Sequence, residues 1–294
     1  MKVTIGIPFF NNRSTLGDAI RSVFAQTFTD WELILMDDGS TDGSLELARS
    51  VKDSRVRVIT DGQNKKLPTR LNDITRSARG ALLARMDADD LMHPERIEKQ
   101  VRFLDENPAI DLVETAMASL DREDRPTGVR GTGAFLQSPL PALRRSLLMH
   151  ATVMGRTEWF RRNPYSTAFP RSEDRELWAR TMFHSRFARI PEPLYFVREG
   201  DTGSPEKYVR ACRTNQRIAL RYGPSAVGWP TTAALWLESF AKGEIYRTAY
   251  MLRLDERLVR RRNHQMSAHE SEPIVARIRQ IKATRLPGLE HATA

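Results

Sequence analysis

Hydrophobic and polar positions follow two alternating periods along the first hundred residues. Short β-branched and apolar runs predict strands at residues 3–8, 31–36, 56–60 and 81–86. Apolar positions at helical spacing predict helices between these strands, at residues 15–26, 44–52 and 73–79. Strands that alternate with helices predict an α/β fold with a parallel sheet and right-handed crossovers.

Acidic clusters follow two of the predicted strands. Asp37 and Asp38 come directly after Met36, and the run Asp87-Ala88-Asp89-Asp90 comes directly after Met86. Ligands of open α/β sheets bind beyond the carboxyl ends of the strands, and parallel strands end at the same edge. We therefore expect both clusters to face a common cleft.

Asp87 and Asp89 are two residues apart on a predicted turn. Oxygen-only ligands of this kind suit hard cations such as Mg²⁺ or Mn²⁺. The alternative is helix capping, with an Asp ahead of Leu91 and Pro94 in the first turn of the next helix. One acid suffices for a cap, so the cluster favours the cation.

Asp37 follows a buried strand, where a carboxylate can accept hydrogen bonds from ribose hydroxyls or a base. Here too the alternative is a turn, with Thr41 or Asp42 capping the following helix. The first strand is not followed by G-x-G-x-x-G, and no G-x-x-x-x-G-K-[ST] loop occurs in the chain. A bound phosphate would therefore need a metal and basic side chains to neutralise it.

The composition is that of an ordinary globular protein, with 40% hydrophobic and 28% charged residues in 294. A single cysteine, Cys212, excludes an internal disulfide and a cysteine-based zinc site and favours a reducing, cytoplasmic compartment. The N-terminal residues read as a first strand and not as a signal peptide. The longest uncharged stretch, residues 222–237, is interrupted by Pro and Gly and falls short of the ~18 residues of a bilayer span.

The net charge of +9 is concentrated in the C-terminal third. Residues 201–294 hold 16 basic and 9 acidic side chains, whereas residues 1–200 are nearly balanced. The local peak comprises Arg257, Arg260, Arg261 and Arg262. Such an excess indicates an anionic partner: nucleic acid, nucleotide or membrane surface.

Several segments together resemble the family 2 glycosyltransferases, which are inverting enzymes of GT-A fold. The stretches TIGIPFFNN and AIRSVFAQTFTDWELILMDDGSTDGS resemble the opening of that family, and ALLARMDADDLMHPERIEKQVRFLDENPAIDLV resembles its D-x-D motif and the helix that follows. Residues 172–178 resemble its E-D-x-x-L-W segment, and residues 149–154 its H-x-T segment. The resemblance covers about residues 1–200. It implies a GT-A domain with a Rossmann-like central sheet and a helical C-terminal extension.

The resemblance implies a nucleotide-sugar site in the first half of that domain. The residues that match its nucleotide pocket are Pro8, Phe10, Asn11, Asp37, Asp38 and Asp87. Asp38 or Asp37 would hold the base or ribose, and Asp87 the ribose or the metal. Asp89 would bind the Mn²⁺ or Mg²⁺ ion that bridges the diphosphate.

In the second half the resemblance implies an acceptor side. Asp174 matches the general base, with Glu173 beside it, although an acidic pair there also suits a helix N-terminus. His150 is a candidate substrate contact, with a packed structural role as its alternative. Residues 121–140 match no part of the family pattern.

The chain departs from the family in two places. The loop after the third strand lacks the usual Gly, which leaves Lys66 or Arg70 to supply charge to the phosphates. After the E-D helix, Arg198 is present, but Gly200 stands where the family often has His. We keep Arg198 as a candidate substrate contact and expect no such His contact here.

The C-terminal third reads as helical, at residues 208–222 and 232–258. A basic amphipathic helix can lie on an anionic membrane surface, or pack on the catalytic domain with its arginines in solvent. We expect a catalytic domain at 1–205, divided at residue 110 into nucleotide-sugar and acceptor halves, and a basic helical region at 206–294.

These observations predict a metal-dependent glycosyltransferase that moves a sugar from a nucleoside-diphosphate sugar to a hydroxyl acceptor with inversion. Uridine is the commonest base, and the expected acceptor is a lipid-linked or growing polysaccharide. The expected location is the cytoplasm, with the inner face of the cell membrane as a peripheral site. The alternatives are a nucleotidyltransferase and a non-catalytic, basic nucleic-acid-binding protein; nucleic acid is not the expected partner.

Overall fold

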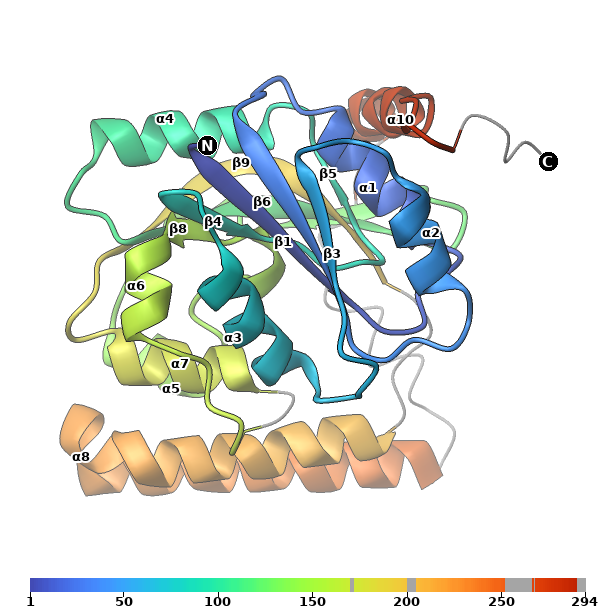
Figure 1. Cartoon of the computed structure of the whole chain (residues 1–294). Helices are drawn as coiled ribbons and strands as arrows, with labels where there is room; N and C mark the ends of the chain where they lie inside the picture. Colours follow the sequence, from blue (N-terminus) through green and yellow to red (C-terminus); the bar gives the residue numbers. More distant parts are fainter. Residues whose placement is uncertain (170–171, 200–204, 252–265, 267, 290–294) are drawn as a thin grey trace.

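One mixed sheet forms the centre of the molecule (Figure 1). In the computed structural model, the described residues are 1–169, 172–199, 205–251, 266 and 268–289. The sheet has nine strands in the order β3-β2-β1-β4-β8-β6-β9-β5, with β7 paired to β6. The strands are β1 (Val3–Phe9), β2 (Trp31–Asp37), β3 (Val56–Ile59), β4 (Leu82–Arg85), β5 (Leu91–Met92), β6 (Leu112–Leu120), β7 (Pro126–Arg130), β8 (Met154–Arg156) and β9 (Phe187–Arg198).

The first four strands pair in parallel, as the sequence pattern predicts. Val3 of β1 lies opposite Trp31 of β2 and Leu82 of β4. Asp37 ends β2 and Asp87 follows β4, so both acidic clusters lie at the same edge of the sheet. The predicted α/β architecture of this half is confirmed.

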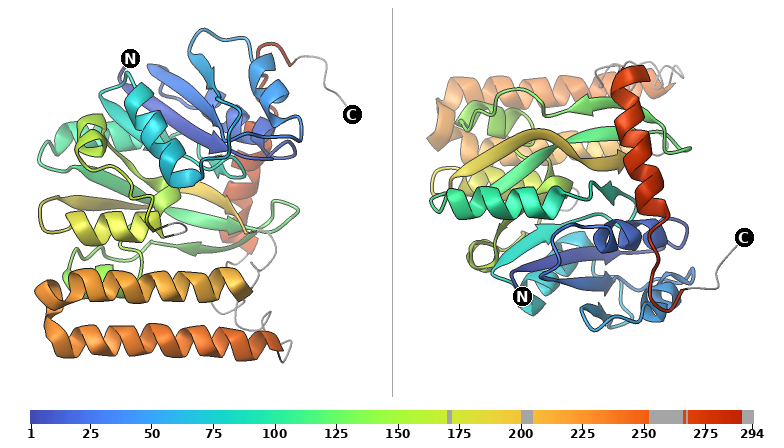
Figure 2. Two further views of the ribbon diagram at one scale, coloured as in Figure 1. Left: turned by 60° about the horizontal axis from the view of Figure 1, so that its bottom comes forward. Right: turned by 90° about the horizontal axis from the view of Figure 1, so that it is seen from above.

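Helices cover both faces of the sheet (Figures 1 and 2). They are α1 (Leu16–Phe24), α2 (Ser44–Ser50), α3 (Leu67–Ser77), α4 (Arg96–Glu106), α5 (Pro139–Arg144), α6 (Thr157–Arg162) and α7 (Glu173–Thr181), with a short 3₁₀ helix η1 (His150–Thr152). The pleat of β2 separates two cores: Leu33 and Leu35 pack with α1 and α4, and Ile34 and Met36 pack with α3, α6 and α7. The acidic edge is thus built on strands buried from both sides.

Two local predictions need correction. Helix α3 begins at Leu67, not at residue 73, because Pro68 suits a first helical turn, where its missing N–H is no loss. The helix-cap alternative for the Asp87–Asp90 run is wrong: Leu91 and Met92 form β5, and α4 begins at Arg96 with Glu95 at its N-cap. The run therefore connects β4, in the middle of the sheet, to β5 at its far end.

The C-terminal third forms two separate structures. Helix α8 (Pro205–Met251) is a hairpin that reverses at Gly228, whose φ of 78° is the left-handed value that glycine adopts without strain. Its arms, residues 205–227 and 229–251, stack beneath α5 and α7 (Figure 2, left). Arg257, Arg260, Arg261 and Arg262, and the end of the helix predicted at 232–258, lie outside the described residues.

Helix α10 (Ala268–Lys282) packs back on the central sheet instead of standing apart from it (Figure 2, right). Its residues Ile274, Ile278 and Ile281 share a core with Leu91, Leu120 and Phe196. The start of α8 coincides with the predicted boundary at residue 205, but α10 belongs with the sheet on the other side of that boundary. Within the described part of the chain, no helix combines the length and the apolar character needed to cross a bilayer.

Candidate active site

The turn after β4 gathers three carboxylates. Asp87, Asp89 and Asp90 place their oxygen atoms within 4.8 Å of one another. Burial, followed by the negative charge of Asp87, raises the pKa of Asp89 and, more strongly, that of Asp90. A cation would relieve this repulsion, and carboxylate oxygens are the donors that Mg²⁺ and Mn²⁺ prefer. The residues present therefore fit a divalent cation, and Asp90 joins the predicted pair as a third candidate ligand.

Arg85 of β4 fixes Asp87 from within the sheet. Its two terminal nitrogens donate to the two carboxylate oxygens of Asp87 at 2.8 and 2.6 Å. The Arg85 side chain is only 7% exposed. A buried bidentate pair of this kind fixes the direction of the carboxylate as well as its charge. Sequence reasoning missed Arg85, since it lies in the middle of an apolar strand pattern.

Strand β9 holds the same turn from the other side. The backbone N–H of Asp87 donates to the Tyr195 hydroxyl at 3.1 Å. The backbone N–H of Arg198 donates to Asp90 Oδ1 at 2.9 Å, and its guanidinium donates to the carbonyl of Asp89 at 3.2 Å. The D-x-D turn is thus clamped between β4 and a strand more than one hundred residues further along the chain.

Arg198 is itself enclosed by acidic side chains. It pairs with Asp18 of α1 at 3.0 Å and with Asp124 of the β6–β7 turn at 2.6 Å. Lys282, at the end of α10, pairs with the same Asp124 at 2.5 Å. In this geometry the Arg198 guanidinium joins α1, the β6–β7 turn and the D-x-D turn, and its predicted substrate contact stays a proposal.

The loop after β2 is organised around Asp38. Its Oδ1 accepts from the backbone N–H of Lys65 at 2.7 Å and from Arg70 Nε at 2.8 Å, and its Oδ2 accepts from the N–H of Lys66 at 3.1 Å. These contacts hold the loop after β3 against the end of β2. The carboxylate retains one of its roughly four acceptor positions.

Arg70 has no donor left for a phosphate. Its other N–H groups bind Asp61, Asp73 and the carbonyl of Gln63, so all five are used. These bonds brace the loop, and the predicted contact of Arg70 with the diphosphate stays a proposal. Lys66 is exposed on the same loop, and its predicted contact stays a proposal.

The other predicted nucleotide residues lie at neighbouring strand ends. Asp37 accepts from the Ser40 N–H at 3.0 Å and from the Thr60 hydroxyl at 2.8 Å. Pro8 is buried near the end of β1, and Phe10, just beyond it, is 46% exposed. Asn11 accepts from the Thr41 N–H at 2.8 Å, which joins the β1 loop to the turn after β2. The structure brings these residues together at one edge.

On the acceptor side, Asp174 lies in the first turn of α7. Ser172 is the N-cap residue and Glu173, which is buried, is the first helical residue. Asp174 is half-buried, and its Oδ2 accepts from the Ser146 hydroxyl at 3.0 Å. Asp174 can thus be a residue of the first turn of α7 and still serve as the predicted general base.

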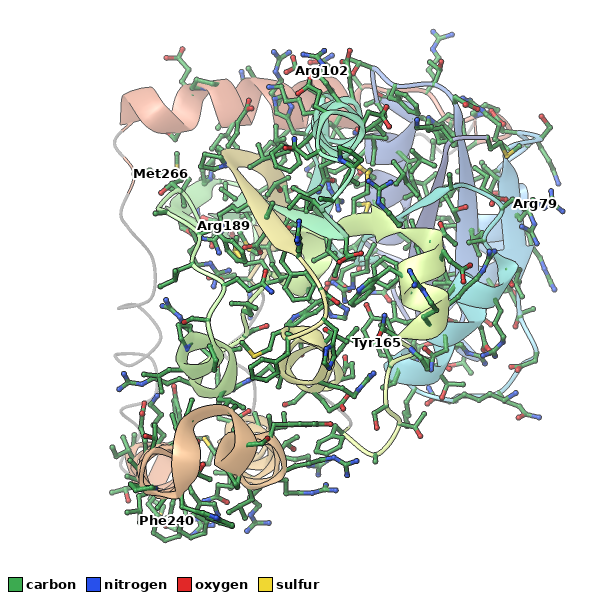
Figure 3. The ribbon with its side chains drawn as sticks, turned by 90° about the vertical axis from the view of Figure 1, so that its left-hand side faces the viewer. Arg79, Arg102, Tyr165, Arg189, Phe240 and Met266 are labelled. Atoms are coloured by element: carbon green, nitrogen blue, oxygen red, sulfur yellow. The ribbon has the colours of Figure 1, made fainter. Side chains whose placement is uncertain are left out.

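Tyr165 lies between the upper and lower parts of the molecule in Figure 3 and contacts His150. Its hydroxyl lies 2.9 Å from His150 Nε2. Burial, together with the negative charges of Asp174, Glu173 and Asp87, raises the pKa of Tyr165, although Arg85 opposes the shift. Burial and the positive charge of Arg85 hold the pKa of His150 well below its usual range, so this histidine is neutral near pH 7. Tyr165 follows Pro164 in a loop with no periodic pattern, and sequence reasoning missed it.

The chain is similar to known families and proteins. The model of glycosyl transferase family 2 matches residues 4–164. A putative glycosyltransferase, EpsE of Bacillus subtilis, is 36% identical over 210 residues, which cover 67% of this chain and 73% of EpsE. Some other relatives are longer, and the match covers 35–36% of their length.

Two solved structures have similar folds. The S. aureus TarS fragment 1–349 in complex with UDP-GlcNAc has a TM-score of 0.61 at 16% identity and covers 82% of this chain and 72% of that one. The mannosyltransferase PcManGT from Pyrobaculum calidifontis, in complex with GDP-Man and Mn²⁺, has a TM-score of 0.62 at 15% identity and covers 85% of this chain and 75% of that one. At these identities the likeness shows a shared fold, which is the GT-A fold of glycosyltransferases.

Proposed function

This chain belongs to glycosyl transferase family 2, and from that premise we propose that it transfers a sugar from a nucleoside-diphosphate sugar to a hydroxyl group, with inversion. The observation that carries the proposal is the arrangement of acids. Three carboxylates lie at the carboxyl edge of the parallel strands, and Asp174 lies in the first turn of α7, near enough to the same region that the charges of Asp174 and Asp87 both act on the pKa of Tyr165. The family match favours sugar transfer over a nucleotidyltransferase or a nucleic-acid-binding protein.

The nucleotide would bind at the ends of β1 and β2. Asp38 has one free acceptor position for an N–H of the base or a ribose hydroxyl, and Phe10 offers an exposed ring beside it. The UDP-GlcNAc and GDP-Man bound to the two structural neighbours support a nucleotide-sugar ligand without selecting the base for this chain. Lys66 would face the diphosphate.

Asp89, with Asp87 and Asp90, would hold a Mg²⁺ or Mn²⁺ ion. Such an ion, when bound, neutralises charge that develops on the departing diphosphate. Arg85 contributes by fixing the direction of the Asp87 carboxylate, and β9 contributes by holding the backbone of the turn. The Mn²⁺ ion in the mannosyltransferase neighbour supports a divalent cation for this fold.

Asp174 would act as the general base. It would accept the proton of the acceptor hydroxyl as that oxygen forms a bond to the anomeric carbon. The bond from that carbon to the diphosphate oxygen breaks on the opposite side, and its electron pair leaves with the diphosphate. Ser146 fixes Oδ2, and no hydrogen bond to Oδ1 from the described residues competes for the incoming proton. One attack from the opposite side inverts the anomeric centre.

The acceptor class, a saccharide or lipid-linked saccharide, rests on the family resemblance. A donor screen tests the proposal without knowledge of the acceptor. We expect one group of nucleoside-diphosphate sugars to raise Tm in the presence of Mn²⁺, with stabilisation of about 2.7 kcal/mol at 100 times Kd. Asp89→Asn should abolish the shift, and Asp174→Asn should retain it. If no nucleotide-sugar shifts Tm with Mg²⁺ or Mn²⁺, the proposal is wrong.

A further inference from the structure

The α8 hairpin has an inner face that packs on the catalytic body. Ile218, Ala219 and Leu235 share a core with Leu143 of α5, Phe169 and Ala179 of α7. The two arms are joined to each other by a stacked pair, Tyr208 and Tyr246, with ring centroids 4.8 Å apart. These contacts fix which face of each arm is covered.

The opposite face is unusually apolar. Of the twelve large hydrophobic side chains that are exposed in the described part of the chain, seven belong to α8: Leu220, Trp229, Leu237, Phe240, Ile245, Tyr250 and Met251. Trp229, Leu237 and Met251 are 67%, 58% and 74% exposed. Trp229, Leu237 and Phe240 recur at helical spacing along one side of the second arm, away from the side that carries Leu235, and Met251 continues that side beyond the Glu244–Arg247 ion pair. An exposed apolar cluster of this kind indicates an interaction surface.

A row of arginines borders this face on the first arm. Arg210, Arg213, Arg217 and Arg221 are exposed and recur every three or four residues, so they lie along one side of the helix. No described carboxylate pairs with any of the four, since Glu238 and Glu244 pair with Arg144, Lys242 and Arg247. Arg217 donates to the carbonyl of Ala168 and lies over the Phe169 ring, and Arg221 lies over the Tyr222 ring, so Arg210 and Arg213 are the two that are best placed to reach an anionic surface. Residues 205–251 hold seven basic and three acidic side chains.

We propose that this face of α8, which we call the foot, docks on an anionic phospholipid bilayer. Apolar and aromatic side chains flanked by arginines are the pattern of interfacial helices, in which the apolar groups enter the acyl boundary and the basic groups reach the lipid phosphates. A second copy of the chain fits less well, since a two-fold contact through the foot would bring unpaired arginines near one another. The docking does not depend on the chemistry proposed above.

The foot packs against the helix that carries Asp174, so docking would set the direction in which the acceptor side faces. Helix α7, which carries Asp174, lies directly against α8, and the Tyr222 hydroxyl donates to Glu176 at 2.5 Å. Figure 3 shows Phe240 at the far end of the molecule from Arg102, with Tyr165 between them. A docked foot would therefore turn the acceptor side toward the bilayer, where an acceptor held in the membrane would meet the base.

Vesicle binding by the full chain tests the foot. We expect sedimentation with phosphatidylcholine vesicles that contain phosphatidylglycerol, weaker binding at high salt, and little binding to pure phosphatidylcholine. The double variant Leu237→Ser, Phe240→Ser should lose at least tenfold in partitioning, whereas Leu136→Ser, at a site that is 69% exposed on another surface, should lose nothing. Arg213→Gln should weaken binding about fivefold, and its control Arg102→Gln on α4 should leave binding unchanged.

Fluorescence of Trp229 gives a second measurement that does not depend on the folding of the variants. Docking should shift the wild-type emission to the blue, and Trp229→Phe should remove most of that shift. Absence of binding to anionic vesicles at low salt would overturn the proposal. So would a concentration-dependent dimer that the double serine variant abolishes, because a second copy would then cover the foot.

Discussion

The donor and acceptor sides of the site are built with very different amounts of support. On the donor side, Asp37, Asp38 and Asp87 each accept two or three hydrogen bonds from neighbouring loops and strands. On the acceptor side, Asp174 accepts one, from Ser146. Asp37, Asp38 and Asp87 thus hold neighbouring loops and strands in place, whereas a substitution of Asp174 breaks a single side-chain contact. Substitutions on the two sides should therefore fail in different ways.

Asp174→Asn should give the largest loss. Removal of a general base commonly costs ~10²–10⁴-fold in rate, and we expect this fall in kcat with donor Kd and Tm near the wild-type values. Initial rates with saturating donor, together with thermal unfolding, measure both quantities. Ser146→Ala is the matched control and should cost much less. If Asp174→Asn lowered Tm as strongly as a donor-side variant, the contrast between the two sides would be wrong.

Arg70→Leu should lower the stability of the fold, whereas Asp174→Asn should lower kcat and leave Tm near the wild-type value. It leaves Asp38, which is 9% exposed on its side chain, without its cation, and breaking a buried pair costs about 3–5 kcal/mol. Chemical denaturation should show this loss of unfolding free energy. Arg76→Leu is the control, since Arg76 pairs with the same Asp73 but is 69% exposed, and it should change stability by less than about 1 kcal/mol. Equal effects of the two variants would argue against a structural role for Arg70.

His150 should make stability depend on pH. Its pKa is lowered in the folded chain, so as pH falls below the unfolded value of about 6.5 the unfolded state binds a proton that the folded state does not. Unfolding free energy should then fall by up to about 1.4 kcal/mol per pH unit from this residue. His150→Asn should remove that share of the slope. Burial also lowers the pKa of His93, so His93→Asn should separately reduce the dependence of the unfolding free energy on pH. An unchanged slope in His150→Asn would contradict the assignment.

Lys282→Met should give the smallest effect. Lys282 is 44% exposed, so solvent screens its pair with Asp124, and a loss of about 0.5 kcal/mol is expected. Because Asp124 also holds Arg198, the affinity for Mn²⁺ should fall about twofold while kcat at saturating Mn²⁺ is retained. Titration with Mn²⁺ measures this, with Arg279→Met, also exposed on α10, as control. An equal fall in Mn²⁺ affinity in Arg279→Met would contradict a specific role for Lys282.

The extent of prediction from sequence differs between the two halves. In residues 1–110, each predicted strand is present, and the two acidic clusters lie at the carboxyl ends of β2 and β4. These features could be predicted because apolar runs and helical spacing report local structure. The predicted start of α3 was wrong and β5 was not predicted, because both depend on which surfaces meet in the folded chain. Tyr165, Arg85 and Asp124 could not be found, since a loop tyrosine, an arginine in a strand and an acid in a turn carry no distinguishing pattern.

The sequence by itself determined the alternating elements, the placement of Asp37, Asp38, Asp87 and Asp89 at strand ends, and the acidic start of α7. These depend on local propensity and on a period of two or 3.6 residues, which neighbours along the chain specify. Only the tertiary structure decided that β9 clamps the D-x-D turn, that α10 returns to the sheet through Ile274, Ile278 and Ile281, and that α8 folds into a foot. Contacts between residues far apart in the chain depend on the full packing of the cores, and no local period records them.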